Sequence, residues 1–411
     1  LGDVYKRQSY MITNESCTFQ YYSNFMRNHP VMDKNIRDDT QISRLLKYNI
    51  KEEDINLFLR AWNQMNNTKE CVYVGYDSTN FNTNAYGIEL ADYGHPKVDE
   101  GLPQYNLAYA VNQKDSTPLF YELYDGSVID NTELEIMLEE AKEFGHEKLG
   151  VLMDRGYISE KNIKALRTKG YEYILMMKQN QRICQEIIEE YGAAVQSLEG
   201  YYIGEHGVYG TTVKKQLYGQ ETNIHVYYDD IRASEEKVAL MSRYETWEKE
   251  IEKKVAKRIA TEGEMKKYRK VFKLKYDQNG YLVAYQRNSR YIKEEIRNLG
   301  FFFIITSEEM STSKALDIYR GRDNIEKMFR SLKSGIDFNK ARVHTTESLK
   351  SKVFVTFIAM IVRNELFQKA EELRKKNRKA YTVPGMISEL ENIECCLLYT
   401  SDAADDTPCV D

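Results

Sequence analysis

Four residues late in the chain could place complementary chemistry on one face of a helix. They are Tyr319, Arg322, Glu326 and Lys333. At about 100° per residue they fall within a stripe roughly 60° wide, so an aromatic ring, two cations and a carboxylate would lie together. The stripe borders an apolar face that we expect to be buried, formed by Ile318, Ile325, Met328, Phe329 and Leu332. A carboxylate there is held rigidly while its oxygens stay reachable. The competing interpretation is a solvated edge of i to i+4 charge pairs.

Two further carboxylates follow apolar runs that read as strands. Asp77 ends the run at 71–76, and Asp154 ends the run at 149–153. Two acids at strand ends and one on a later helix are the parts of a two-cation site for phosphodiester chemistry. Mg²⁺ prefers hard carboxylate oxygens and keeps several waters, so few protein ligands suffice. One ion would activate the attacking water or 3′-hydroxyl, and the other would stabilise the departing 3′-oxygen.

These segments resemble a known family. The helical pattern Y-x2-R-x3-E-x6-K resembles the signature of the insertion-sequence-four-like group of bacterial DDE transposases. Residues 154–157, Asp-Arg-Gly-Tyr, resemble that group's D-R-G-[FY] block, and residues 77–79 resemble its first-aspartate block. The resemblance covers roughly residues 70–370. It implies that Asp77, Asp154 and Glu326 hold two Mg²⁺ ions, for which Mn²⁺ can substitute.

The same resemblance implies a DNA-binding role for the other residues of the stripe. Tyr319, Arg322 and Lys333 would hold the end of a mobile element near the cleaved phosphate. Cations pair with phosphates, and an aromatic ring can stack on an unpaired base. Lys178, at the end of a predicted strand, and Arg155, next to a metal ligand, are further candidates for phosphate contacts.

The resemblance implies an α/β fold with a ribonuclease-H-like catalytic core. Apolar and β-branched runs predict its strands at 71–77, 85–90, 105–111, 118–124, 149–153 and 171–177. Helical periodicity places helices between and after them. We expect the following domains: an N-terminal helical remnant of a truncated DNA-binding region at 9–68, the catalytic core at 69–179 and 299–370, and a β-rich insertion domain at 180–298.

The two ends of the sequence look foreign to this pattern. Residues 1–8 and the stretch that begins at residue 396 resemble translated sequencing-adapter read-through. We therefore expect 1–8 and 396–411 to be non-native and to lie outside the folded core.

Charge and composition limit the cellular setting. The formal net charge is −5, but residues 253–299 hold 14 Lys and Arg against 5 Asp and Glu. We expect this basic run to contact DNA through the insertion. Six cysteines without metal-ligand spacing indicate reduced thiols. The sequence contains no run of about 18 apolar residues, so it predicts no membrane helix. These features favour a bacterial cytoplasmic protein, associated with the nucleoid when bound to DNA.

The function predicted from the sequence is DNA transposition. The protein would cleave the terminal inverted repeats of an insertion element and join them to target DNA, acting as a homodimer on paired ends of double-stranded DNA. Two alternatives stay open. One is a truncated, non-catalytic relative that inhibits transposition or is inert. The other is a cellular metal-dependent nuclease on the same core, which would not need the Tyr319, Arg322 and Lys333 set.

Overall fold

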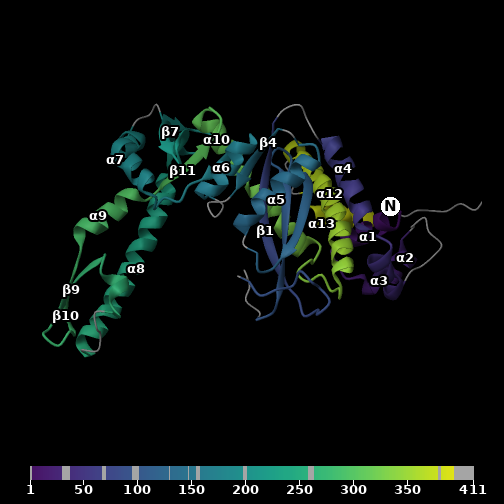
Figure 1. The fold of residues 1–411 in the computed structure, drawn as a ribbon, viewed down its shortest axis with the longest axis horizontal. Helices are drawn as coiled ribbons and strands as arrows, with labels where there is room; N and C mark the ends of the chain where they lie inside the picture. The colour runs from purple at the N-terminus through teal and green to yellow at the C-terminus, as the bar shows by residue number, and fades with distance from the viewer. Residues whose placement is uncertain are drawn as a thin grey trace, which may run out of the picture. The chain divides into compact units, whose positions relative to one another are not determined.

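The protein folds into two compact units, and the first of them is formed by two separate stretches of the sequence (Figure 1). In the computed structural model, Leu1–Lys148 and Arg322–Asp411 form the first unit, and Leu149–Gly321 form the second. The structure describes residues 2–29, 38–66, 71–94, 101–128, 130–146, 148–153, 158–197, 201–257, 263–377 and 381–392. Within these ranges no helix is long and apolar enough to cross a membrane.

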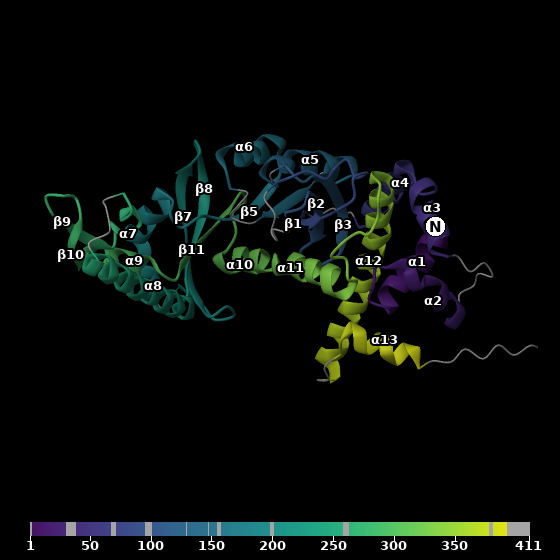
Figure 2. The ribbon, with the colours of Figure 1, turned by 90° about the horizontal axis from the view of Figure 1, so that it is seen from below.

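Antiparallel strands form the sheet of the first unit. β1 (Val72–Asn82) pairs with β2 (Gln104–Asn112), and β2 pairs with β3 (Pro118–Asp125). Every residue of β2 except the last is buried, so this strand is covered on both faces. Figure 2 shows α5 (Asp130–Glu143) on one side of the strands and α11 (Asp323–Arg330) on the other. The helix α11 therefore lies directly over the strand that carries Asp77.

Helices from both ends of the chain pack together beside this sheet. The long helix α12 (Thr346–Asn377) contacts α1 (Gly2–Thr13), α3 (Asp39–Tyr48) and α4 (Glu52–Asn66). Phe58 of α4 meets Phe354 of α12 with ring centroids 5.3 Å apart. The unit's other helical segments are η1 (Phe19–Tyr21), α2 (Tyr22–Asn28), the π-helical turn η5 (Ser331–Gly335) and α13 (Val383–Glu391).

The first residues of the chain belong to this unit. We predicted that residues 1–8 would lie outside the core, but α1 begins at Gly2 and buries Val4 and Arg7. Arg7 lies 5.5 Å from the ring centroid of Tyr22. The prediction that these residues lie outside the core was wrong because it rested on a likeness to adapter sequence, whereas burial is decided by contacts with other helices. Residues 396–411 lie outside the described part of the chain.

The second unit contains a sheet with both parallel and antiparallel pairs. β4 (Leu149–Met153) pairs in parallel with β5 (Glu172–Met176). β5 then continues in antiparallel order to β11 (Phe301–Thr306), β8 (Gln220–Tyr228), β7 (Val208–Leu217) and β6 (Tyr202–Ile203). The strands β4 and β11 are buried along their whole length, as expected for strands covered on both faces.

Clear local signals place the helix between the parallel strands. α6 (Glu160–Lys169) begins after Ser159, whose hydroxyl accepts a hydrogen bond from the backbone N–H of Asn162 at 3.2 Å. It ends at Gly170, whose φ of 74° is the left-handed conformation that glycine adopts without cost. The predicted strands at 149–153 and 171–177 are thereby confirmed as a β–α–β connection.

The segment at 180–298 differs from the β-rich prediction because its helices are longer than its strands. It contains α7 (Arg182–Ser197), α8 (Asp230–Lys257) and α9 (Ser289–Asn298) as well as strands. β7 and β8 join the sheet beside β11. The remainder forms what we call the outer lobe: α8, η4 (Lys266–Tyr268), β9 (Phe272–Tyr276), β10 (Leu282–Arg287) and α9. A charged helix is predicted from the sequence only at 245–259, whereas α8 begins at Asp230, so the helical content of the segment is larger than expected.

The outer lobe has a small hydrophobic core of its own. Tyr244, Tyr268 and Phe272 are almost completely buried in it, and Trp247 packs against it. The indole of Trp247 meets the ring of Tyr268 edge-on, with centroids 5.6 Å apart. This tryptophan is therefore part of the packing of the lobe.

Candidate functional site

Asp77 lies in the middle of β1, not at its end. The prediction that the strand stops at Asp77 was wrong because the ladder with β2 continues as far as the pair Asn82 and Gln104. Polar side chains from Ser78 onward do not end a strand whose backbone hydrogen bonds are still satisfied by a neighbour. Asp77 is half-buried, and its Oδ1 accepts a hydrogen bond from the backbone N–H of Ser78 at 2.9 Å.

The start of α11 packs on the same face of β1 that carries Asp77. Residues two apart on a strand share a face, so Gly75 and Asp77 point to the same side. A Cβ at Gly75 would lie 3.8 Å from the Cβ of Ile325. Asn324 donates a hydrogen bond from Nδ2 to the carbonyl oxygen of Gln113 at 3.0 Å, which fixes the helix at the sheet edge.

The turn after α11 reaches the same face further along the strand. Lys333 donates a hydrogen bond from Nζ to Oγ1 of Thr79 at 2.7 Å and lies 5.4 Å from the ring centroid of Phe81. Asp77 lies between Gly75 and Thr79 in the alternating pattern. It therefore faces the helix that carries Glu326.

A buried tyrosine completes this interface. Tyr109 is the cross-strand neighbour of Asp77 on β2, and its ring meets that of Phe329 edge-on at 5.8 Å. Burial raises the pKa of Tyr109 above its usual value, so the phenol stays protonated beside the carboxylate position. Sequence analysis missed Tyr109 because its role depends on the register between β1 and β2.

The signature segment is not one continuous helix. α10 (Thr312–Arg320) ends before Gly321, and α11 begins at Asp323. Glycine lowers helix stability by about 1 kcal/mol relative to alanine, which favours a break at this point. Ser311 caps α10, accepting a hydrogen bond from the backbone N–H of Lys314 at 3.2 Å. The predicted apolar face at Ile318, Ile325, Met328, Phe329 and Leu332 is buried, which confirms that part of the pattern.

Arg322 and Glu326 form an ion pair at the start of α11. Nη2 of Arg322 donates a hydrogen bond to Oε1 of Glu326 at 2.8 Å. The Arg322 side chain is 17% exposed and that of Glu326 is 52% exposed, so the arginine is held while the carboxylate stays reachable. The guanidinium balances the charge of a carboxylate that points toward solvent.

Two of the other predicted site residues, Tyr319 and Lys178, belong to the second unit. Tyr319 is buried at the end of α10 in the second unit, not exposed on a stripe as expected. Lys178 is exposed in the second unit, after β5. Asp154 and Arg155 lie outside the described residues.

The donors present on the β1 and α11 face suit a hard divalent cation. Asp77 and Glu326 offer carboxylate oxygens, and both are at least partly accessible. Oxygen ligands with room for water are what Mg²⁺ requires. The carboxylates of Asp77 and Glu326 therefore fit a site for a hard divalent cation.

A separate cluster in the second unit has ligand spacing but different chemistry. Within the described residues, ligand atoms of Glu205, His206 and Asp317 lie within 4.8 Å of one another. His206 Nε2 lies 2.7 Å from Asp317 Oδ1, and its Nδ1 lies 2.8 Å from Nη1 of Arg320. Because an arginine can only donate, Nδ1 accepts and Nε2–H faces the carboxylate. A cation already occupies the neighbourhood, so we interpret the cluster as a brace between the turn after β6 and α10.

Comparison with known families decides the class of the protein. The family described as Transposase DDE domain matches residues 74–362. The chain belongs to this family. Membership implies an enzyme of the polynucleotidyl transferase or nuclease type, and the match spans both the β1 strand and the α11 helix. A comparison with curated proteins gave no match.

Solved transposase structures show distant similarity to this transposase-domain chain. One is a piggyBac transposase synaptic complex with hairpin DNA, at 10% identity and a TM-score of 0.40, over 91% of this chain and 63% of that one. Another is the Mos1 transposase paired-end complex with the left transposon end, at 16% identity and a TM-score of 0.19, over 38% of this chain and 49% of that one. A third is the Drosophila P element transposase strand transfer complex, at 13% identity and a TM-score of 0.26, over 92% of this chain and 82% of that one. The chain thus spans less than two thirds of the piggyBac protein.

Proposed function

We propose that this protein is a DNA transposase of the insertion-sequence-four-like group, with a ribonuclease-H-like core and a metal site formed by Asp77, Asp154 and Glu326. It cleaves the ends of an insertion element and joins them to target DNA, working as a homodimer on paired ends. The order of the elements supports the core: an antiparallel meander β1–β2–β3, then the parallel pair β4 and β5 joined through α6.

One observation carries this proposal. α11 lies on the face of β1 that holds Asp77, so the first unit brings two predicted ligands, Asp77 and Glu326, to one interface. They are 249 positions apart in numbering, and no local interaction requires them to meet. The buried apolar residues Ile325 and Phe329 are sufficient to pack the helix on the strand, so packing alone does not require acidic residues beside them.

The residues of the chain have separable tasks at this interface. When bound, Mg²⁺ would lower the pKa of the attacking water or hydroxyl and stabilise charge on the leaving oxygen. Asp77 and Glu326 supply negative charge for the ions. Arg322 holds the Glu326 side chain through its hydrogen bond. Lys333, positioned by Thr79, places a cation at the same face, where it can contact a DNA phosphate.

The test is a nicking and joining assay with Mg²⁺ or Mn²⁺ on plasmid DNA that carries the repeats flanking the gene, with a gel-shift in EDTA beside it. Asp77→Asn and Glu326→Gln should each reduce nicking by at least about 100-fold, since each removes a charge that the ions require. Both should still bind DNA in EDTA. Arg322→Ala should weaken both end binding and nicking.

Glu205→Gln is the matched control, because it alters an exposed carboxylate of the other acidic cluster. It should nick at the wild-type rate. Wild-type nicking by Glu326→Gln would refute the site, and loss of nicking in Glu205→Gln alone would move it to the second unit. Nicking without joined products would indicate a nuclease. DNA binding without any nicking by the wild-type chain would indicate a non-catalytic relative.

A further inference from the structure

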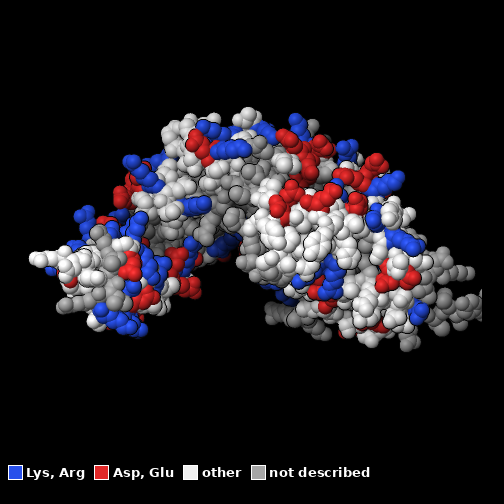
Figure 3. Space-filling model, turned by 60° about the horizontal axis from the view of Figure 1, so that its bottom comes forward, with Lys and Arg blue, Asp and Glu red and all other residues white. Residues whose placement is uncertain are grey.

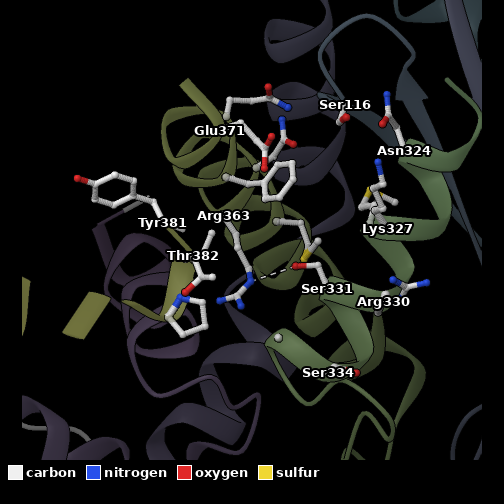
Figure 4. A pocket seen from close by; sticks show the side chains of 18 of the residues that line it. Ser116, Asn324, Lys327, Arg330, Ser331, Ser334, Arg363, Glu371, Tyr381 and Thr382 are labelled. Atoms are coloured by element: carbon white, nitrogen blue, oxygen red, sulfur yellow. Dashed lines mark hydrogen bonds between the residues drawn. The ribbon is translucent and has the colours of Figure 1, made fainter. Parts of the chain in front are cut away.

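A cavity in the first unit lies against a different face of α11 from Glu326 (Figure 4). Its volume is about 840 Å³, within the range of about 300–1,000 Å³ typical of small-molecule sites. The helix contributes Asn324, Lys327 and Met328, and Ser331 follows, a spacing of three and four residues that marks one face. Glu326 does not line it. The cavity is therefore distinct from the proposed metal site.

The cavity has an excess of positive charge in a chain that is acidic overall. Six cations and two carboxylates line it. Four of these cations, Lys114, Lys327, Arg330 and Lys375, form no ion pair within the described residues, and all four are exposed. Charges of one sign gathered in a concave surface attract counter-charged ligands, because low-dielectric walls focus their field.

A fifth cation is fixed in the wall of the cavity. Arg363 is 7% exposed; its Nε donates to Oγ of Ser331 at 3.0 Å, and its Nη2 donates to Oε1 of Glu15 at 2.8 Å. Its Nη1 is buried without a hydrogen-bond partner among the described residues. Figure 4 shows this guanidinium close to Ser331 and Thr382. A buried N–H without a partner is costly, and an anion moving into the cavity is the kind of group that satisfies it.

The helix α13 adds a further electropositive element. Thr382, Val383 and Pro384, where this nine-residue helix begins, line the cavity. The N-terminus of a helix carries partial positive charge, which favours an anion. Pro384 has no N–H and the N–H of Gly385 donates to Oγ1 of Thr382 at 3.2 Å, so α13 contributes mainly this partial charge. The cations that line the cavity and the N-terminus of α13 therefore both favour binding of an anion.

Apolar and aromatic side chains supply the remaining walls. Phe367 is 40% exposed although it is an aromatic residue on a long helix, and it lines the cavity with Tyr381, Met328 and Met360. A simple inorganic anion would leave these surfaces unused. A ligand that joins a phosphate to a flat aromatic body would use both the cations and the rings.

We propose that this cavity binds a nucleotide, with its phosphate near Lys327 and Arg330 and its base against Phe367. The same chemistry is offered by a free mononucleotide and by the phosphorylated end of a DNA strand. The site does not depend on metal-assisted cleavage, since none of the residues proposed to hold the metal ions lines it.

The test measures binding to the full chain in EDTA by isothermal titration calorimetry, so that failure of the cleavage mechanism cannot affect it. The probes are dAMP, deoxyadenosine, inorganic phosphate and single-stranded decamers with and without a 5′-phosphate. Wild-type protein should bind dAMP at least tenfold more tightly than deoxyadenosine. Lys327→Ala and Arg330→Ala should each weaken dAMP binding by about tenfold, the loss expected for one charge-assisted hydrogen bond.

Two further variants separate the roles of charge and ring. Phe367→Ser should weaken dAMP about tenfold but leave the affinity for inorganic phosphate unchanged, because stacking involves only the base. Arg44→Ala changes an exposed arginine on α3 that does not line the cavity, and it should bind dAMP like the wild type. Melting curves for each variant check that the fold is kept.

The outcomes decide both the site and the source of its ligand. If the 5′-phosphorylated decamer binds at least tenfold more tightly than dAMP, and Arg330→Ala removes that advantage, the ligand is a strand end. Equal or weaker binding of the decamer assigns a free nucleotide. Equal affinities of wild type, Lys327→Ala and Arg330→Ala for dAMP, or no dAMP binding by folded wild type, would overturn the proposal.

Discussion

The basic residues of the outer lobe and those of the cavity beside α11 differ in what they contact. In the lobe and at its base, cations meet carboxylates: Lys267 lies 3.2 Å from Glu250, Arg287 bonds Glu248, and Arg297 lies 3.3 Å from Glu189. Around the cavity, Lys327 and Arg330 have no ion-pair partner among the described residues. The left part of Figure 3 shows blue and red side chains interspersed over the lobe.

This difference shows why a count of charges along the sequence does not locate a binding surface. The run at 253–299 looked strongly basic, but the acids that offset it are on α8 and α7, outside the counted segment. The cations of the cavity come from segments far apart in sequence, so no window of the sequence shows them together. Whether a cation is already paired matters more for ligand binding than how many neighbours share its sign.

The two regions should also differ in what keeps them folded, and the largest effect expected is in the core of the lobe. Phe272→Ala removes a fully buried ring and should destabilise the lobe by about 3–5 kcal/mol. Urea denaturation can follow this locally, because the chain has two tryptophans, Trp247 in the lobe and Trp62 in α4. In a Trp62→Phe background, the Trp247 transition should shift to lower urea.

The control for that experiment is Tyr281→Ala, which truncates an aromatic side chain that is 41% exposed beside β10. It should shift the Trp247 transition by less than about 1 kcal/mol. Binding of dAMP to the cavity should survive Phe272→Ala. The Trp62 signal is followed separately in a Trp247→Phe background. An equal shift of that signal on Phe272→Ala would mean that the lobe and the first unit unfold together, and the comparison between them would fail.

A smaller effect, dependent on pH, should arise at the base of the lobe. His225 on β8 is fully buried between Thr212 and Thr306, with ring nitrogens 2.7 and 3.1 Å from their hydroxyl oxygens. Thr306 donates its own hydroxyl to the carbonyl of Glu308, so it accepts from His225 Nε2–H. In the neutral imidazole, Nδ1 then accepts from the hydroxyl of Thr212. Burial lowers the pKa of His225 to about 4.

The sign of the pH effect follows from that lowered pKa. In the unfolded chain His225 binds a proton below its ordinary pKa of about 6.5, whereas in the folded chain it binds one only near pH 4. Stability should therefore fall as pH falls from 6.5 to 4, by roughly 1.4 kcal/mol per unit at most. His225→Gln should lose stability at pH 7 but show a shallower decline toward pH 5. An unchanged slope in the variant would contradict the assignment.

The sequence predicted local elements well and long-range geometry poorly, for physical reasons visible in particular residues. β4 and α6 follow from short-range patterns, and the structure confirms them. The break at Gly321 was missed because a single glycine changes the helical periodicity of the segment very little. The central position of Asp77 in β1 was missed because it depends on pairing with β2. The roles of Asp77, Asp154 and Glu326 remain a prediction from the family signature.

The smallest predicted effect tests the comparison of charges most directly. Lys266 and Lys267 are neighbours in η4, but Lys267 pairs with Glu250 and lies 4.5 Å from the ring centroid of Tyr268, whereas Lys266 is exposed and has no ion pair among the described residues. A cation already neutralised by a carboxylate releases little counterion on meeting a phosphate. Lys267→Ala should therefore change DNA affinity by less than about twofold and leave the salt slope in place.

Lys266→Ala is the matched variant, and gel-shifts across a range of salt concentrations compare the two. If the lobe covers DNA, loss of Lys266 should reduce the salt slope by about one, the change expected for one phosphate contact. If both variants keep the wild-type slope, the lobe does not touch DNA and its basic run serves only to balance the acids of α8 and α7. A slope reduced by Lys267→Ala but not by Lys266→Ala would show that DNA breaks the pair with Glu250, and the rule that paired cations are unavailable for binding would fail in this protein.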